Sequence, residues 1–300
     1  MKYFLLLLLI TFEFLIIYVQ TETTPNVGIP NLENRSEKKN LIKLTQKNFV
    51  VIRGGIDGTN SAKIINQLLS KQRGAGEENS ELYVYISTNG GSVIDGMQII
   101  QTLKSLSENK INVKCIADIA LSMGFVIFQY CPVRYVTLST ILMQHQMYLE
   151  SHGPINQVNN YLSFINSMET EIDSQQATRL GKTVAEFKAL IAHDWWLFGE
   201  NNIKHKTADM LTNVLCDFDP TLMNVNETLQ TWFGDIVLTY SSCPMARAPL
   251  HIAFKNASIS SEDKQKIIDM YHCSPQSYIS CSRSSQTHEQ ENLCCARKIY

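Results

Sequence analysis

The sequence has no excess of charge of either sign. Its 300 residues include 26 basic and 28 acidic side chains, which gives a formal net charge of −2. Proteins that bind nucleic acids through phosphate contacts carry a surplus of lysine and arginine, and this chain has no such surplus. We therefore expect no nucleic-acid partner. The length allows one large domain or two modest ones.

Two further absences narrow the chemistry. No two cysteines have the C-x₂-C spacing of a structural zinc site, so we expect neither a metal nor another cofactor. No lysine lies between Lys114 and Lys182. A serine–lysine catalytic dyad within that stretch would lack its base, which argues against this mechanism.

The cysteines that are present gather near the C-terminus. Six of the eight lie in the last third of the chain: Cys216, Cys243, Cys273, Cys281, Cys294 and Cys295. This clustering predicts disulfides formed in an oxidising compartment, with fifteen possible pairings among which the sequence does not choose. Three N-glycosylation sequons, at Asn34, Asn226 and Asn256, point to the same compartment.

The N-terminus predicts entry into the secretory pathway. Residues 4–19 follow a lysine and are apolar except for Thr11 and Glu13. We interpret residues 1–21 as a signal peptide, so that the protein is secreted or lumenal. No small-x-small cleavage site follows, and if the signal is not cleaved residues 4–19 would anchor the protein in the membrane. The short length and Glu13 favour cleavage. Residues 22–40 are predicted to be a flexible linker.

The middle of the chain alternates strands with helices. Buried strands are predicted at 48–53, 82–86 and 112–116, and amphipathic helices at 61–69 and 93–103. This order implies an α/β domain with a parallel sheet, whose active site is expected at the carboxyl ends of the strands. The Gly90-Gly91 turn and Ser122 both lie at such ends, so they are expected to face one another.

Ser122 is the candidate nucleophile. It stands between a predicted strand and the apolar helix that follows, where free backbone N–H groups favour developing negative charge. The alternative is that Ser122 only caps this helix, since serine is a favoured cap residue. Taken alone, the stretch favours the cap.

Other residues complete a possible acyl-transfer site. His145 is a candidate base, Asp194 a candidate for orienting that base, and the amides of Gly91 and Met123 are candidate oxyanion donors. Each also has a structural interpretation: His145 as a core histidine, Asp194 as a helix terminator, and the glycines as a tight turn.

Together these segments resemble the proteolytic subunit of the Clp protease, from about Asn48 to Leu211. The resemblance is carried by an opening strand, a glycine loop and the nucleophile, histidine and aspartate motifs, at 49–56, 83–97, 120–124, 143–146 and 194–197. It implies a ClpP/crotonase-type fold of repeated ββα units with a protruding handle helix, and a serine endopeptidase that cleaves polypeptides with a Ser122–His145–Asp194 triad. It also implies self-association into stacked heptameric rings through the helix of residues 155–180.

Three features depart from the family pattern. Asn89 stands where the family usually has a proline, and the segment between Ser122 and His145 is two residues shorter than expected. The family normally works with a hexameric ATPase inside bacteria or organelles. The signal sequence and a C-terminal tail without family counterpart place that ATPase partner in doubt here.

The resulting domain prediction has a ClpP-like peptidase domain at 41–212 and a small cysteine-rich extension at 213–300. We expect the extension to fold separately with disulfide staples, because a segment this short would otherwise be marginally stable. Part of the long helix is expected to pack against a neighbouring subunit, with Ile165 as a surface-facing position.

Two other functions compete with the peptidase. A catalytically silent ring subunit or scaffold is motivated by Asn89 and the shortened segment, although such a protein has no chemical reason to keep Ser, His and Asp together. An acyl-CoA hydratase or isomerase of the same superfamily would use the glycine loop but would not need Ser122.

Overall fold

The computed structural model describes residues 41–74, 81–221 and 224–272. The predicted signal peptide, the predicted linker, the Asn34 sequon and the four cysteines after residue 272 lie outside the described residues. Within them, no helix is long and apolar enough to cross a membrane.

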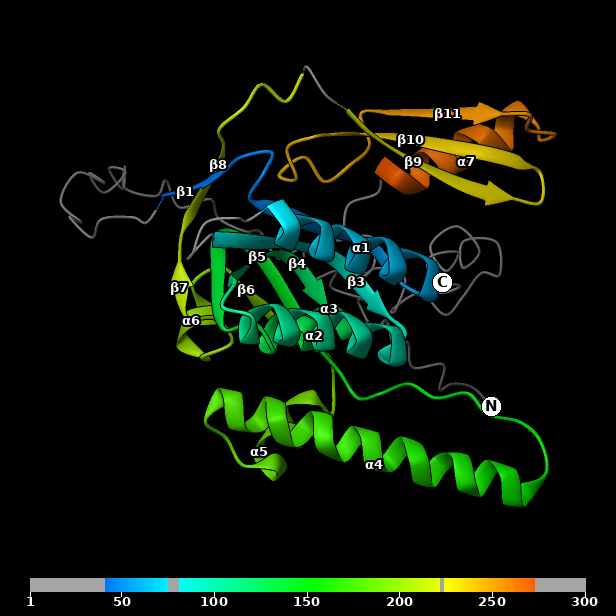
Figure 1. Ribbon diagram of the computed structural model, residues 1–300. Helices are drawn as coiled ribbons and strands as arrows, with labels where there is room; N and C mark the ends of the chain where they lie inside the picture. Colours follow the sequence, from blue (N-terminus) through cyan, green and yellow to red (C-terminus); the bar gives the residue numbers. More distant parts are fainter. Residues whose placement is uncertain (1–40, 75–80, 222–223, 273–300) are drawn as a thin grey trace, which may run out of the picture. The chain divides into compact units, whose positions relative to one another are not determined.

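A mixed sheet forms the centre of the fold (Figure 1). Its four long strands are parallel and neighbours in chain order: β2 (Phe49–Ile56), β3 (Glu81–Gly91), β4 (Asn112–Leu121) and β5 (Val133–Gln144). Two short strands join β5, the antiparallel β6 (Trp195–Phe198) and the parallel β7 (Met210–Leu211). The predicted α/β alternation is thus confirmed. The observed strands extend beyond the apolar segments from which they were predicted.

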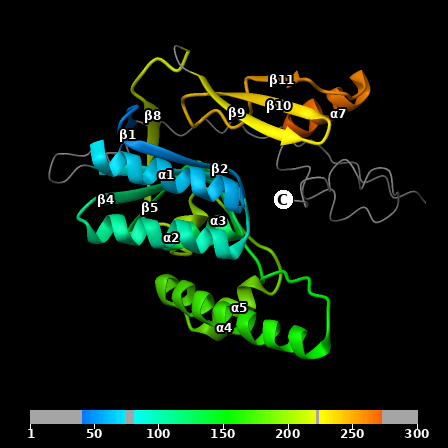
Figure 2. The ribbon, with the colours of Figure 1, turned by 45° about the vertical axis from the view of Figure 1, so that its right-hand side comes forward.

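Three helices cover one face of this sheet. They are α1 (Gly58–Gly74), α2 (Val93–Glu108) and α3 (Met123–Gln129), and Figure 2 shows the first two lying side by side. Successive strand residues point to opposite faces. Val84 and Ile86 of β3 therefore join the main core under the helices, whereas Tyr83 and Tyr85 join a second cluster on the other face.

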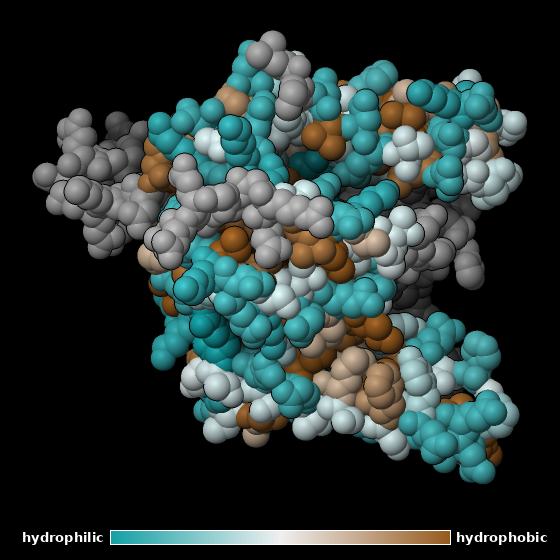
Figure 3. Space-filling view, viewed as in Figure 1, coloured by the Kyte–Doolittle hydropathy of each residue, from teal (hydrophilic) through white to brown (hydrophobic). Residues whose placement is uncertain are grey.

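The predicted long helix is α4 (Ile155–Leu180). It ends at Gly181, whose left-handed φ of 66° terminates the helix, and α5 (Val184–Ile191) follows with the predicted capping box of Thr183 and Glu186. Apolar side chains interrupt the hydrophilic surface over α4 (Figure 3), and the exposed ones are Ile155, Tyr161, Leu162 and Phe164.

The expectation that Ile165 faces the surface is wrong. Its exposed fraction is 9%, because it lies seven residues from the buried Ile172 and so shares the inward face of α4. Ile155 and Leu162, also seven residues apart, lie on a neighbouring face that remains exposed.

The C-terminal extension begins with β8 (Asn213–Cys216), which pairs in parallel with β1 (Leu41–Leu44). A three-stranded antiparallel sheet follows, with strands β9 (Asn224–Thr231), β10 (Gly234–Ser241) and β11 (His251–Lys255), and then α7 (Ser261–His272). A disulfide joins Cys216 to Cys243. The extension is therefore joined to the first strand of the described chain by backbone pairing, and the division at residue 212 stays a prediction.

Candidate active site

The chain turns sharply at Ser122, between the end of β4 and the start of α3. Ser122 has φ 53° and ψ −120°, a left-handed φ that is strained for a residue with a side chain. Its side chain makes no capping hydrogen bond to α3. Its N–H donates to the Met143 carbonyl at 2.8 Å, which ties the turn to the end of β5. The Ser122 hydroxyl is thus left free of the helix that it precedes.

His145 follows β5 directly and lies next to this turn. Because β4 and β5 are neighbours with Leu121 opposite Met143, the sheet brings the ends of both strands together. His145 Nε2 lies 2.8 Å from Ser122 Oγ, and the imidazole is half-buried. When His145 carries its proton on Nδ1, the Ser122 hydroxyl donates to Nε2, which is the arrangement a general base requires.

Asp194 is brought close by the backbone without contacting His145. The antiparallel pairing of β5 and β6 ends with Gln144 opposite Trp195, and His145 and Asp194 are the residues directly beyond this last pair. The Asp194 side chain is exposed, and among the described residues no hydrogen bond joins it to the imidazole. The structure therefore brings two of the three predicted residues into contact and leaves the third beside them.

The glycine loop presses against the nucleophile turn. Gly90 has φ 94°, and a Cβ at this position would lie 2.8 Å from both the Met123 nitrogen and Ser122 Cβ. No side chain fits there, so only glycine permits the loop to approach so closely. The Gly90 N–H is already used, because it donates to Thr88 Oγ1 at 3.1 Å. This hydrogen bond leaves the next amide, that of Gly91, as the candidate donor from this loop.

Met123 is fixed by α2. Its side chain is 2% exposed, and a Cβ on Gly96 of α2 would collide with it. Ser92 caps α2 as predicted, since its side chain accepts a hydrogen bond from the Asp95 N–H. The residue that supplies the second candidate oxyanion amide is thus held between the sheet and a well-terminated helix.

A disulfide that sequence analysis missed encloses the same turn. Cys115 of β4 pairs with Cys131, which follows α3, and the 16-residue separation contains Ser122. Both cysteines are buried. Apart from the presence of two cysteines outside the C-terminal group, no local signal in the sequence indicates this pairing, because the partners lie on different elements.

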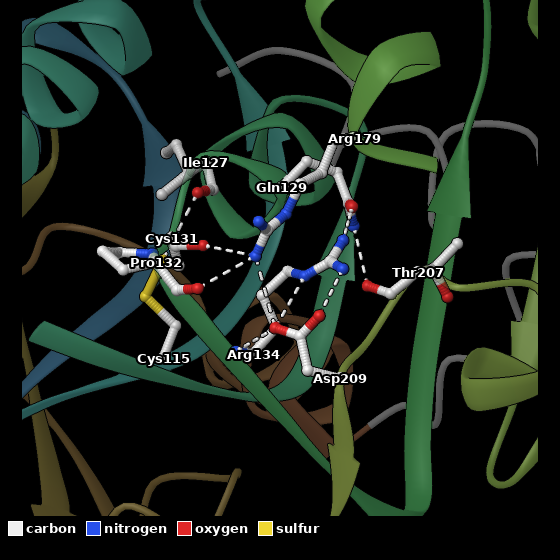
Figure 4. A network of polar contacts seen from close by, with 9 residues as sticks. All are labelled: Cys115, Ile127, Gln129, Cys131, Pro132, Arg134, Arg179, Thr207 and Asp209. Carbon is white, nitrogen blue, oxygen red and sulfur yellow. Dashed lines mark hydrogen bonds and ion pairs between the residues drawn. A yellow bond between two sulfur atoms is a disulfide. The ribbon is translucent and has the colours of Figure 1, made fainter. Parts of the chain in front are cut away.

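Beyond α3, a polar network ties β5 to α4 (Figure 4). Arg134 donates from Nε and Nη2 to the two carboxylate oxygens of Asp209, at 3.2 and 2.6 Å, and also contacts Gln129. Arg179 reaches the same carboxylate at 3.3 Å. Burial raises the pKa of Asp209, but the hydrogen bonds and charge of Arg134 outweigh it, so this pKa lies below its usual value. Sequence analysis did not single out this network.

Other kinds of site are not found among the described residues. No group of three or more His, Cys, Asp or Glu side chains there could hold a metal ion. A cavity of about 370 Å³ lies between the end of α3 and the second half of α4, lined by residues 129–132, 174–176, 178 and 179. It does not include Ser122 or His145.

Comparisons with protein families and with individual proteins both point to the Clp protease. The family model described as Clp protease matches residues 33–211. The ATP-dependent Clp protease proteolytic subunit 2 of Tropheryma whipplei (strain Twist) is 25% identical over 180 residues, covering 58% of this chain and 97% of that protein. The ATP-dependent Clp protease proteolytic subunit of Streptococcus gordonii is 23% identical over 171 residues, covering 56% and 85%. The family match ends within β7, before the extension.

Proposed function

The chain belongs to the Clp protease family, whose α/β fold it shares, and from this premise we propose that it is a serine endopeptidase that hydrolyses peptide bonds in unfolded proteins or peptides. The observation that carries the proposal is the 2.8 Å contact between His145 Nε2 and Ser122 Oγ at a strained turn. A serine that only capped α3 would need neither the strain nor the imidazole.

In the proposed reaction, Ser122 Oγ attacks the carbonyl carbon of the scissile bond while His145 Nε2 accepts the hydroxyl proton. The amides of Gly91 and Met123 stabilise the resulting oxyanion. The imidazolium then protonates the leaving amine, which gives an acyl-enzyme on Ser122. A water molecule, deprotonated by His145, hydrolyses this ester and restores the free serine.

Asp194 is proposed to orient His145 through Nδ1 once the site is complete. His145 and Asp194 directly follow and precede the last pair of the β5–β6 ladder, so their backbones start from neighbouring positions. The residue is exposed in the single chain. Substrate or a neighbouring subunit would therefore have to supply the contact that turns the carboxylate inward.

Self-association into rings is proposed from the exposed apolar side chains of α4. Ile155 is 78% exposed and Phe164 51%, more than a helix facing water normally leaves uncovered. Light scattering coupled to size-exclusion chromatography should give a multiple of the subunit mass that the same protein shows under denaturing conditions. Leu162→Glu should reduce that mass, whereas Asn160→Glu, on the same exposed helix, serves as the matched control. A wild-type protein that stays monomeric at micromolar concentration would contradict the ring.

Location in the secretory pathway remains part of the proposal. The two disulfides are consistent with an oxidising compartment. The Asn226 and Asn256 side chains are exposed, so both predicted glycosylation sites are accessible. Expression in secreting cells followed by glycosidase treatment should lower the apparent mass. An unchanged mass would argue against glycosylation at either asparagine.

The second candidate is a silent scaffold, which the unbonded Asp194 favours. Hydrolysis of fluorogenic peptides by the assembled wild-type protein, with Ser122→Ala as the control, separates the two functions. The peptidase requires turnover that disappears in Ser122→Ala. Equal rates for both proteins would favour the scaffold.

A further inference from the structure

The extension reaches the strand that carries the nucleophile. We propose that Arg247 is a positioning residue for the ends of β4 and β5, and that the Cys216–Cys243 disulfide holds it there. This inference rests on the proposed function. It gives the segment outside the family match a role in the chemistry of the family domain.

Arg247 makes a two-point ion pair with Asp118 of β4. Its Nε donates to Asp118 Oδ2 at 2.7 Å and its Nη2 to Oδ1 at 2.5 Å. Asp118 is 5% exposed and lies four residues before Ser122. The only other hydrogen-bond partner of its carboxylate among the described residues is the Ser87 hydroxyl at 3.3 Å. Without Arg247, the strand leading to the nucleophile would carry a buried carboxylate that has lost its ion-pair partner, which is strongly unfavourable.

Asp118 marks an irregularity in the sheet. The pairing of β4 with both neighbouring strands breaks between Ala117 and Ile119, and the register with β5 jumps from Val136 to Ile141 across the break. Because the ladder is interrupted here, side-chain contacts hold the backbone of β4 beside Asp118, and one of them is a buried hydrogen bond from Thr140 Oγ1 to the Ala117 carbonyl at 2.7 Å.

Arg247 supplies a further contact, to both strands. Besides Asp118, its Nη2 donates to the carbonyl of Ser139, in the part of β5 that the register jump leaves unpaired with β4, at 3.4 Å. β4 ends just before Ser122 and β5 ends just before His145. One guanidinium thus links the two strands that position the nucleophile and its base.

Arg247 lies in the loop of residues 242–250 between β10 and β11, and several contacts hold the first part of this loop. Cys243 is bonded to Cys216 at the end of β8, which pairs with β1. Arg53 of β2 donates to the Ala246 carbonyl at 3.4 Å and lies 4.3 Å over the Tyr240 ring. Arg247 is the fourth residue after Cys243, so the disulfide anchors this loop close to Arg247.

The test measures the rate at which a fluorophosphonate labels Ser122, per folded molecule, in the full chain. Arg247→Ala should slow labelling on the order of tenfold, as small displacements of catalytic groups do. The double variant Asp118→Asn/Arg247→Ala should recover only the part of the loss that the uncompensated carboxylate causes, because the link between β4 and β5 is still missing. Full recovery would mean that Arg247 only neutralises Asp118. Cys216→Ala/Cys243→Ala should show a smaller loss. Lys43→Ala removes another ion pair to the extension, that with Asp217, and should label at the wild-type rate.

A second readout does not depend on catalysis. Hydrogen exchange of the backbone amides at 119–123 should be faster in Arg247→Ala, and it should stay faster than wild type in the double variant, which also lacks the guanidinium. If Arg247→Ala does not fold, Arg247→Lys keeps the charge and loses the second contact, and should show the same changes to a lesser degree. Unchanged labelling per folded molecule together with unchanged exchange would overturn the inference. A wild-type protein that takes up no probe but shows the exchange effect would instead overturn the proposed peptidase alone.

Discussion

The turn that carries Ser122 and the segment that carries Asp194 differ in how firmly the chain holds them. Ser122 is strained, enclosed by a disulfide and pressed by Gly90, and its hydroxyl meets His145 at 2.8 Å. Asp194 precedes a four-residue strand, is exposed and makes no hydrogen bond to the imidazole. One part of the site is assembled within the chain, and the other is only placed nearby.

The difference separates two ways of building a site. A strained backbone costs about 1–3 kcal/mol and persists only where the surrounding packing determines it. The buried contacts around Ser122 meet that condition without any partner. A carboxylate on an exposed segment keeps its rotational freedom until something binds, so Asp194 is the part of the site that assembly or substrate can complete.

Of the changes considered, removing the base should have the largest effect on the reactivity of Ser122. His145→Ala should slow fluorophosphonate labelling of Ser122 by about 10⁴–10⁶-fold, as loss of a triad histidine does. Labelling rates over several hours would measure it. The exposed neighbour of Asp194 provides the control, and His193→Ala should label at close to the wild-type rate. Similar rates for both histidine variants would mean that His145 does not activate Ser122.

A side chain at Gly90 should displace the Ser122 turn by steric clash alone. Gly90→Ala places a Cβ against Met123 N and Ser122 Cβ at a positive φ, so labelling should fall by about 10²-fold, the effect of roughly 1 Å of displacement. Gly58→Ala meets only an ordinary contact at 3.6 Å and should be neutral. A Gly90→Ala protein that labels normally would show that the loop does not set the position of the nucleophile.

Removing the Asp194 charge should distinguish the firmly held Ser122 turn from the loosely held Asp194 segment, because the effect on labelling should depend on assembly. In the unassembled chain, Asp194→Asn should slow labelling by less than about threefold, since there is no bond to His145 to lose. In the assembled protein the loss should approach the roughly 10⁴-fold drop of a misoriented triad histidine. The two fractions can be separated by size-exclusion chromatography before labelling. A large loss in the monomer would contradict the account of a loose aspartate.

The smallest effect on chemistry is expected away from both segments. Asp209→Asn should lower the free energy of unfolding by about 1–3 kcal/mol, a range reduced because a third of its side chain is exposed, while labelling per folded molecule stays unchanged. Because the Asp209 pKa is depressed in the folded protein, its stabilisation is present above the unfolded carboxyl pKa and is lost as pH falls through the lower folded pKa. Acid unfolding curves that coincide for variant and wild type would contradict this.

The sequence predicts those parts of the site that depend on the order of strands and helices along the chain. Alternating strands and helices place Ser122 and His145 at adjacent strand ends, so pattern and motif suffice to predict that they approach each other. The Cys115–Cys131 and Arg247–Asp118 contacts join residues from different elements, and no local pattern encodes them. Ile165 was misplaced because a wide apolar stripe on α4 does not reveal which of its faces is buried. The orientation of Asp194 depends on contacts outside its own segment.

The central claim is that His145 activates Ser122 as a nucleophile. Its most direct test is to treat the assembled, full-length protein with a fluorophosphonate near neutral pH and map the modified residue by mass spectrometry, with Ser122→Ala in parallel. The account predicts one adduct, on Ser122, that is absent from the variant. A folded and assembled wild-type protein that takes up no probe, or is modified elsewhere, would contradict it.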